Sequence, residues 1–147
     1  MKFAIIGCGS IGSRHARNLI SLGHEVFLHD VMENKATTLA QELSAKVYDD
    51  TTPADAHVDA WIICTPPFKH LETAKLAITQ GFHAFIEKPI SHTIDGVGDL
   101  LKRANESGLT VAVGYQLRFD NGLLKMKELI DTGVIGDVLH AFGCRGP

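Results

Sequence analysis

Apolar stretches of strand length alternate along this chain with stretches whose apolar residues recur every three or four positions. Such alternation is typical of a parallel β-sheet flanked by helices. Most of the short stretches lack polar alternation, as expected for strands covered on both faces. The pattern predicts an α/β fold with a doubly wound parallel sheet, and the predicted strands are Lys2–Ile6, Glu25–Asp30, Lys46–Tyr48, Ala60–Cys64, Ala84–Glu87 and Thr110–Val113.

Two apolar stripes with helical spacing lie between these strands. The first consists of Ala36, Leu39, Ala40 and Leu43, and the second of Ile94, Val97, Leu100, Leu101 and Ala104. Glycine readily adopts the left-handed conformation that often follows a helix C-terminus. Three helices are therefore expected to end at Gly23, Gly81 and Gly108.

The pattern changes after Gly114. A polar helix is expected from about Asn121 to Asp131, then a turn over residues 132–136 and a strand from Asp137 to Arg145. A terminal strand without a neighbouring strand leaves its backbone N–H and C=O groups unpaired. We therefore expect a main domain over residues 1–120, and over residues 121–147 a connecting helix and the first strand of a truncated second domain.

Composition narrows the possible functions. The chain has 147 residues and a formal charge of −3, from 14 Lys and Arg against 17 Asp and Glu, so a nucleic-acid partner is not expected. No apolar run is long enough to span a bilayer, which predicts no membrane role and a cytoplasmic protein. The three cysteines are widely spaced and include no C-x-x-C pair, so we expect reduced thiols, no disulfide framework and no metal site.

Gly7-Cys8-Gly9-Ser10-Ile11-Gly12 follows a predicted strand and opens a predicted helix. In a G-x-G-x-x-G segment of this kind the first glycine allows a tight turn, the second lets a diphosphate approach the backbone, and the third allows close packing of helix and strand. The free amides from Ser10 to Gly12 and the positive helix end favour an anion. An ordinary strand-to-helix corner is the alternative.

Asp30 ends the second predicted strand, eighteen residues after Gly12. A carboxylate near this offset accepts hydrogen bonds from the adenosine ribose of a dinucleotide, whereas the 2′-phosphate of NADP would place like charge against it. Val31 and Met32 provide no arginine to neutralise that phosphate. The sequence therefore favours NAD over NADP. A purely local role for Asp30, capping a turn, is the alternative.

Two neighbouring residues are assigned no chemistry. His15 follows the glycine loop by one helical turn and is interpreted as a hydrogen-bonded core histidine rather than a ligand. Cys8 lies within the loop, where a small filler side chain is expected.

Three segments follow the fourth, fifth and sixth predicted strands, at the sheet edge where doubly wound folds bind ligands. They are Thr65-Pro66-Pro67-Phe68-Lys69-His70, Glu87-Lys88-Pro89 and Gly114-Tyr115-Gln116-Leu117-Arg118-Phe119. Together with the glycine loop and a later I-G-D-V turn, these segments resemble the Gfo/Idh/MocA family of oxidoreductases over the whole chain. The E-K-P tripeptide is the most specific element.

The resemblance implies a Rossmann-type dinucleotide-binding domain in which Lys88 is the catalytic lysine. It also implies that the Lys88–Pro89 bond is cis, that Thr65, Pro66 and His70 line the nucleotide, and that Glu87 faces the nicotinamide ribose. Gln116 and Arg118 occupy matching positions near the nicotinamide. A solvated lysine, a turn at Thr65–Pro67 and a surface helix start at His70 are the alternatives for these residues.

The resemblance further implies an NAD-dependent oxidoreductase that transfers hydride between nicotinamide and a sugar, nucleotide-sugar or cyclitol hydroxyl or keto group. Relatives carry a second α/β domain that covers the substrate, and that domain is essentially absent from this sequence, so these 147 residues alone are expected to be inactive. A homo-oligomer is expected by the same likeness. A non-catalytic dinucleotide-binding or redox-sensing module is the alternative, because this fold hosts many functions.

Overall fold

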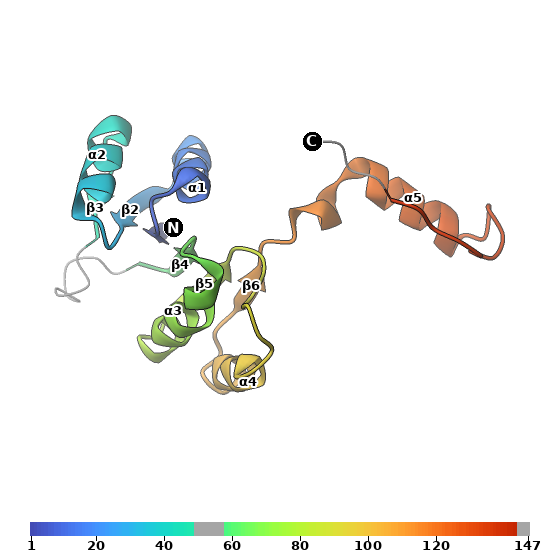
Figure 1. Ribbon diagram of the computed structural model, residues 1–147. Coiled ribbons are helices and arrows are strands. Elements are labelled where there is room, and N and C mark those ends of the chain that lie inside the picture. Colours follow the sequence, from blue (N-terminus) through green and yellow to red (C-terminus); the bar gives the residue numbers. More distant parts are fainter. Residues whose placement is uncertain (49–57, 144–147) are drawn as a thin grey trace. The chain divides into compact units, whose positions relative to one another are not determined.

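A computed structural model describes residues 1–48 and 58–143 of the chain (Figure 1). Strands and helices alternate, as the hydrophobic pattern predicts. In chain order the elements are β1 (Lys2–Ile6), α1 (Ser10–Ser21), β2 (Glu25–His29), α2 (Glu33–Leu43), β3 (Lys46–Val47), β4 (Ala60–Ile63), α3 (Pro67–Thr79), β5 (His83–Ile86), α4 (Val97–Glu106), β6 (Val111–Val113), the 3₁₀ helix η1 (Gln116–Phe119) and α5 (Asn121–Asp131). The six strands predicted before Gly114 are confirmed to within one residue at each end.

The six strands form one parallel sheet in the order β3-β2-β1-β4-β5-β6. Phe3 of β1 pairs with Val26 of β2 on one side and with Ala60 of β4 on the other. The chain therefore leaves the centre of the sheet in one direction through β2 and β3, and in the other through β4 to β6. This arrangement confirms the doubly wound fold, whose ligand edge lies at the carboxyl ends of the strands near β1 and β4.

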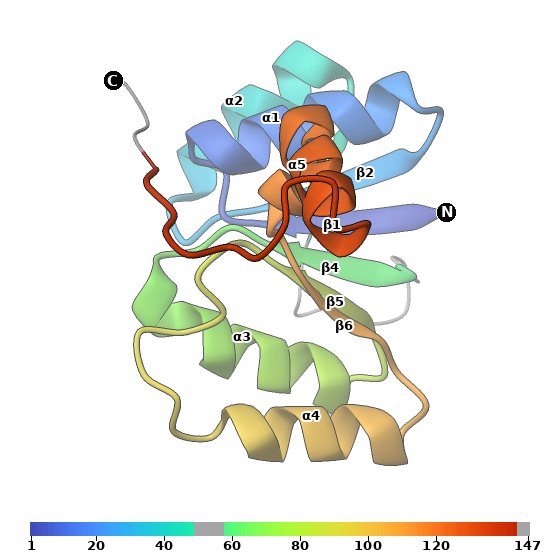
Figure 2. The same cartoon turned by 90° about the vertical axis from the view of Figure 1, so that its right-hand side faces the viewer.

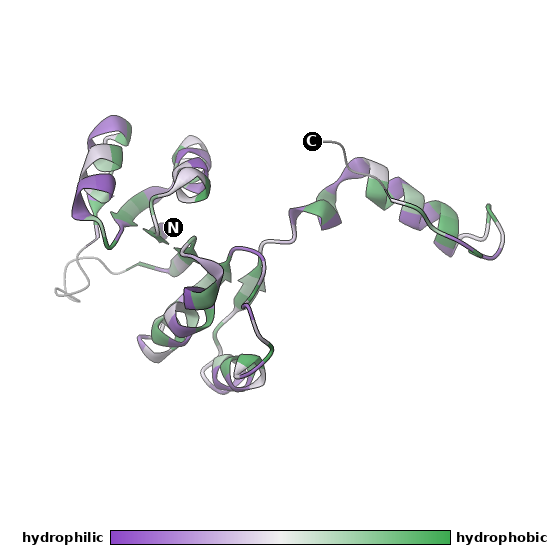
Figure 3. Ribbon diagram, in the orientation of Figure 1, coloured by the Kyte–Doolittle hydropathy of each residue, from purple (hydrophilic) through white to green (hydrophobic). Residues whose placement is uncertain are grey.

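Helices cover both faces of the sheet. Figure 2 shows α1 and α2 on one side of the strands and α3 and α4 on the other. Alternate residues of β1 enter the two layers, because Ile5 packs on the side of α1 and α2 whereas Ala4 and Ile6 pack on the side of α3 and α4. The central strands are accordingly apolar on both faces, and Figure 3 shows hydrophilic and hydrophobic residues alternating along the helices.

The predicted helix ends are confirmed, since Gly23, Gly81 and Gly108 have φ angles of 79°, 86° and 65° just after α1, α3 and α4. The apolar stripe of α2 is also confirmed, with Ala36, Leu39 and Ala40 buried.

The stripe predicted for α4 is only partly correct. Ile94 lies before the helix and its residue is 81% exposed, because Gly96 adopts a left-handed conformation (φ 77°) and α4 starts at Val97. Leu101 is 45% exposed, whereas Val97, Leu100 and Ala104 are buried as predicted.

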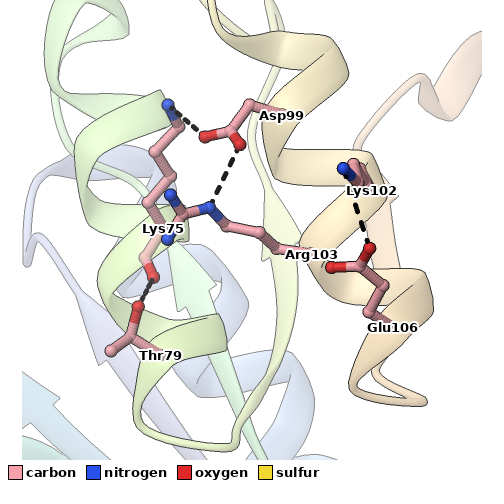
Figure 4. Close-up of polar contacts among 6 residues, drawn as sticks. All are labelled: Lys75, Thr79, Asp99, Lys102, Arg103 and Glu106. Atoms are coloured by element: carbon pink, nitrogen blue, oxygen red, sulfur yellow. Dashed lines mark hydrogen bonds and ion pairs between the residues drawn. The ribbon is translucent and has the colours of Figure 1, made fainter.

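A small charged network joins α3 to α4 (Figure 4). Asp99 of α4 accepts from Lys75 of α3 at 3.1 Å and from Arg103, one turn further along α4, at 3.2 Å. Hydrogen bonds from these two cations lower the pKa of Asp99 below its ordinary value. The exposed side chains make this network a minor contributor to stability, because water screens surface ion pairs.

Residues 1–114 form one compact unit, and a second unit begins at Tyr115, six residues before the domain boundary expected after residue 120. In the second unit, Asp120 caps α5 by accepting from the backbone N–H of Leu123 at 3.0 Å. The predicted helix Asn121–Asp131 is confirmed. The strand predicted from Asp137 to Arg145 is wrong over residues 137–143, which form no strand, and residues 144 and 145 lie outside the described residues. A strand requires a neighbour to pair with, and none of the described residues supplies one here.

Within the described ranges, no helix combines the length and apolar character needed to cross a membrane.

Candidate nucleotide-binding site

The glycine loop connects β1 to α1, and internal packing fixes two of its three glycines. Gly7 has a φ of +103°, and a Cβ there would lie 2.8 Å from the carbonyl oxygen of Cys64. A Cβ on Gly12 would overlap the carbonyl oxygen of Gly7. These positions therefore need glycine for the turn and for the close contact of helix and strand, as predicted.

Gly9 differs from the other two glycines. A Cβ built on Gly9 meets no atom within 4 Å, and its φ of −72° is one that any residue adopts. Nothing in the chain's own packing therefore requires a glycine here. The first helical bond of α1 runs from Ser13 N–H to the Gly9 carbonyl, so within the described residues the amides of Ser10, Ile11 and Gly12 have no acceptor. Open space beside free amides at a helix N-terminus fits a diphosphate.

Asp30 lies just after β2 and reaches the glycine loop. Its Oδ2 accepts from the backbone N–H of Cys8 at 2.8 Å, and its Oδ1 accepts from the backbone N–H of Met32 at 2.9 Å. The turn-capping alternative is therefore realised in the structure. A carboxylate offers about four acceptor positions, so Asp30 retains capacity for ribose hydroxyls while it holds the loop.

A cleft runs beside the glycine loop between α1 and α2. Gly9, Ser10 and Ser13 line one side, and the other side includes Asn34 and Lys35. Sequence reasoning missed Lys35, although a cation five residues after Asp30 was visible in the sequence. Lys35 places positive charge close to the loop, where it lowers the pKa of Cys8 against the larger raising effects of burial and Asp30.

Thr65 and Pro66 follow β4 at the same edge of the sheet. The hydroxyl of Thr65 is buried and has no hydrogen-bond partner among the described residues. A buried hydroxyl without a partner is costly, so a ligand that supplied one would be favoured. Pro66 is the N-cap of α3 and Pro67 its first residue. Because proline has no N–H, the N-terminus of α3 offers fewer free donors than that of α1.

His70 is buried and makes its polar contacts within the protein. Its residue is 1% exposed, and its two ring nitrogens lie 2.7 Å from backbone carbonyl oxygens, Nε2 from that of Thr65 and Nδ1 from that of Pro89. Both nitrogens are thus engaged within the protein. His70 connects the segment after β4 to the segment after β5 and offers no polar atom to a nucleotide. The surface-histidine alternative is equally excluded by this burial.

Glu87 and Lys88 follow β5. One oxygen of Glu87, Oε1, lies 2.8 Å from Nε2 of His15 on α1, and the other accepts from the backbone N–H of Lys88 at 3.2 Å. The ring of His15 meets Phe85 edge-on, with 5.5 Å between the ring centroids. The prediction of a hydrogen-bonded His15 is confirmed, although the residue is only partly buried.

Lys88 is exposed, and its ammonium has no hydrogen bond or ion pair within the part of the chain that the structure describes. The Lys88–Pro89 bond is cis, as the family resemblance implies. Lys88 therefore presents an unpaired cation at the sheet edge that also carries the glycine loop and Asp30.

The two described cysteines are held as thiols. Burial, with the charge of Asp30, raises the pKa of Cys8 to about 11, and burial, with the charge of Glu87, raises the pKa of Cys64 to about 12. Protonated thiols are poor nucleophiles. The structure supports the filler role expected for Cys8.

Gln116 and Arg118 belong to η1 in the second unit, and both residues are exposed. Their contact with the nicotinamide stays a prediction. The remaining predicted residues, apart from His70, gather at the carboxyl ends of β1, β2, β4 and β5, because parallel strands all end at one edge of the sheet.

The fold and this edge define a dinucleotide-binding Rossmann domain. Comparison with known proteins gives the family: residues 1–115 match the Gfo/Idh/MocA family, described as an oxidoreductase family with an NAD-binding Rossmann fold, and the chain belongs to that family.

Three relatives show how much of such proteins the chain represents. An uncharacterized oxidoreductase of Streptococcus pneumoniae is 34% identical over 99% of this chain and 40% of its own length. A myo-inositol 2-dehydrogenase of Thermotoga maritima is 29% identical over 92% of this chain and 42% of its own length. The crystal structure of scyllo-inositol dehydrogenase from Lactobacillus casei with bound NAD(H) and scyllo-inositol is 28% identical, with a TM-score of 0.83 over 93% of this chain and 42% of that chain. The chain thus spans about two fifths of the length of these relatives.

Proposed function

We propose that this chain is the nucleotide-binding half of an NAD-dependent oxidoreductase that acts on a CH–OH group of a sugar, nucleotide sugar or cyclitol. The observation that carries the proposal is the sheet edge itself, where the free amides of residues 10–12 follow β1, the Asp30 carboxylate follows β2, and Lys88, which has no partner among the described residues, follows β5. The relatives named above include two inositol dehydrogenases, which supports a polyhydroxylated substrate.

Three features of the chain fit NAD. The open space at Gly9 would admit a diphosphate to the amides of residues 10–12. The buried hydroxyl of Thr65 lacks a partner that a bound nucleotide could supply. Asp30 would take the adenosine ribose, and its negative charge favours NAD over NADP. When bound, the nicotinamide supplies the hydride acceptor or donor.

The chemical task assigned to the chain falls to Lys88. Its ammonium would donate a hydrogen bond to the carbinol oxygen, orient it, and stabilise the negative charge that develops on this oxygen when its proton passes to a general base before hydride leaves the carbon, or when hydride adds to the carbonyl in the reverse direction. Such a group must be unengaged elsewhere, and Lys88 has no competing partner among the described residues. Glu87 is fixed by His15 and would meet the nicotinamide ribose beside it.

The rest of the assignment follows from the same chemistry. A small-molecule substrate and NAD, rather than a nucleic acid, are the proposed ligands, in keeping with the net charge of −3. A homo-oligomer is proposed by analogy with the family, and the cytoplasm as the place where the cofactor is available.

Titration of the purified 147-residue chain with NADH tests the first part of the proposal. We expect saturable binding, seen as a change in nicotinamide fluorescence and as heat in calorimetry. We also expect weaker binding of NADPH and no oxidation of sugars or inositols by this chain alone. No binding at millimolar NADH would overturn the proposal.

The second part concerns Lys88. Lys88→Ala should leave the unfolding free energy of the chain within about 0.5 kcal/mol of wild type, because the side chain is exposed. In a longer protein that includes this chain, it should lower turnover at least a hundredfold. Lys69→Ala, another exposed lysine near the start of α3, is the matched control and should leave turnover unchanged. Full activity in the Lys88 variant would instead favour the non-catalytic dinucleotide-binding module.

A further inference from the structure

The environment of His70 is unusual for a buried side chain. The residue is 1% exposed, lies in the first turn of α3, and is the only charged or polar residue among the fully buried ones described. Its two contacts reach the carbonyl of Thr65, which follows β4, and the carbonyl of Pro89, nineteen residues away along the chain and next to Lys88. One imidazole therefore connects the two segments that flank the proposed nicotinamide end of the site.

The chemistry of the two partners restricts the state of the ring. A carbonyl oxygen accepts hydrogen bonds and has no proton to give. A neutral imidazole carries one N–H, so it could donate to only one of the two oxygens, and its other nitrogen would turn a lone pair toward the second. At 2.7 Å that arrangement is repulsive. Both distances match the short contacts typical of charge-assisted donors.

We propose that His70 is a positioning residue, which donates from both ring nitrogens and thereby holds the Lys88 segment in place against the segment after β4. The proposal rests on the function proposed above, since Lys88 and its neighbours are taken to lie at the nicotinamide. His70 acts through the backbone of Pro89 and does not itself touch the cofactor, because its residue is buried and both nitrogens are occupied.

The bond from His70 has a counterpart on the other side of Lys88. His15 of α1 holds the Glu87 side chain, and Glu87 accepts from the Lys88 backbone N–H. The residues immediately before and after Lys88 are thus each tied to a histidine from a different helix. Loss of His70 should release the carbonyls of Pro89 and Thr65 from each other, whereas Glu87 on the other side of Lys88 stays tied to His15. The expected consequence is disorder at the nicotinamide end, with the glycine loop and Asp30 unchanged.

Nuclear magnetic resonance of the 147-residue chain, labelled with ¹⁵N at histidine, tests the protonation state directly. We expect both ring nitrogens of His70 to have the chemical shifts of protonated nitrogens near neutral pH, with slowly exchanging protons. The signal is assigned by its absence from His70→Gln. A single protonated nitrogen would overturn the double-donor bridge.

Ligand binding tests the positioning. Wild type, His70→Leu and His70→Gln are titrated with NADH and with ADP-ribose, which has the same adenosine, diphosphate and second ribose but no nicotinamide. We expect His70→Leu to weaken NADH binding at least fivefold more than ADP-ribose binding. If that variant does not fold, His70→Gln should give a smaller split in the same direction.

The control is His83, a histidine at the end of β5 opposite to Lys88. His83 accepts from the backbone N–H of Thr110 through Nδ1 at 2.9 Å, so His83→Leu also removes a histidine–backbone bond, but at the amino end of the strand. We expect it to change both affinities by the same factor. Equal losses of NADH and ADP-ribose in the folded His70 variants would overturn the inference. Wild type that bound neither ligand would instead refute the proposed function.

Discussion

The two halves of the candidate site are built in different ways. The half after β1 and β2 binds through the backbone: the amides of residues 10–12 have no acceptor among the described residues, and the carboxylate of Asp30 holds the loop at Cys8. The half after β4 and β5 works through side chains, with Glu87 fixed by a histidine 72 positions earlier and Pro89 fixed by His70. The first half therefore depends on the space that side chains leave open, and the second on bonds between distant segments.

This difference determines how each half should respond to substitution. In the first half an added methyl group lowers stability or binding, because it fills space needed by the chain or by an anion. In the second half the removal of a polar atom lowers stability or binding, because it leaves a buried partner without a hydrogen bond. Predictions for the two halves can therefore be separated by measuring stability and binding on the same variants.

The largest effect is expected from the glycine loop. Gly12→Ala places a methyl group against the Gly7 carbonyl, so it should lower the unfolding free energy by about 3 kcal/mol. Gly9→Ala meets no atom within 4 Å, so it should cost less than about 1 kcal/mol. The same variant should weaken NADH binding at least about tenfold, or 1.4 kcal/mol. Denaturant unfolding and NADH titration of both variants check this contrast, which fails if Gly9→Ala binds NADH normally.

An intermediate effect is expected from Asp30. Asp30→Asn should lower NADH affinity about tenfold, because an amide is a weaker acceptor for ribose hydroxyls and for the Cys8 N–H. It should also raise the relative affinity for NADPH, since the like charge is gone while Lys35 remains nearby. Calorimetry with both cofactors measures the ratio.

Asp59→Asn is the matched control for this change. Asp59 also accepts from a backbone N–H, that of Lys2 at 2.7 Å. It lies just before β4, however, at the amino-terminal ends of the strands and therefore opposite the candidate site. We expect normal affinity for both cofactors. An unchanged cofactor ratio in Asp30→Asn would contradict the assignment of Asp30 to the ribose.

The smallest effect concerns the two thiols, one in each half of the site. The pKa is about 11 for Cys8 and about 12 for Cys64, against an ordinary value of 9.0. At pH 8 the folded chain therefore holds about a hundredfold less Cys8 thiolate than the unfolded chain, and still less Cys64 thiolate. Alkylation should therefore be slow until the chain unfolds. Because the folded pKa values are raised, the thiols contribute stability below pH 9 that is lost as the pH rises through 11 and 12.

Mass spectrometry after timed iodoacetamide treatment of a Cys144→Ser variant checks this prediction without interference from the third thiol. Modification of either remaining cysteine in the folded chain as fast as in urea would show that the thiols are not protected.

Local sequence was sufficient for the fold and for the first half of the site. Strand lengths, helical spacing and the glycines after helices predicted the elements of residues 1–114, because each signal depends on neighbours a few positions apart. The stripe expected for α4 begins too early, since Ile94 lies before Gly96, which adopts a left-handed conformation, and the helix starts only at Val97. The strand expected after Asp137 failed for another reason: a strand depends on a partner as well as on its own pattern.

The second half of the site could be predicted only in part. The family resemblance identified Glu87 and Lys88, but no spacing in the sequence connects Glu87 to His15 or His70 to Pro89. Such contacts depend on which helix packs against which strand, and that is a property of the assembled fold. The contacts of His70 were missed because its burial and the two carbonyl oxygens beside its ring are visible only in three dimensions.

The two prolines that open α3 distinguish it from α1, although both helices begin at the same edge of the sheet. Because neither Pro66 nor Pro67 has an N–H, α3 has fewer free N–H donors at its start than α1. The N-terminus of α1 is therefore the better binding site for a phosphate. The two helix starts thus favour α1 as the place of the diphosphate, and in the proposed function Asp30 after β2 and Lys88 after β5 would determine which end carries adenine and which the reactive ring.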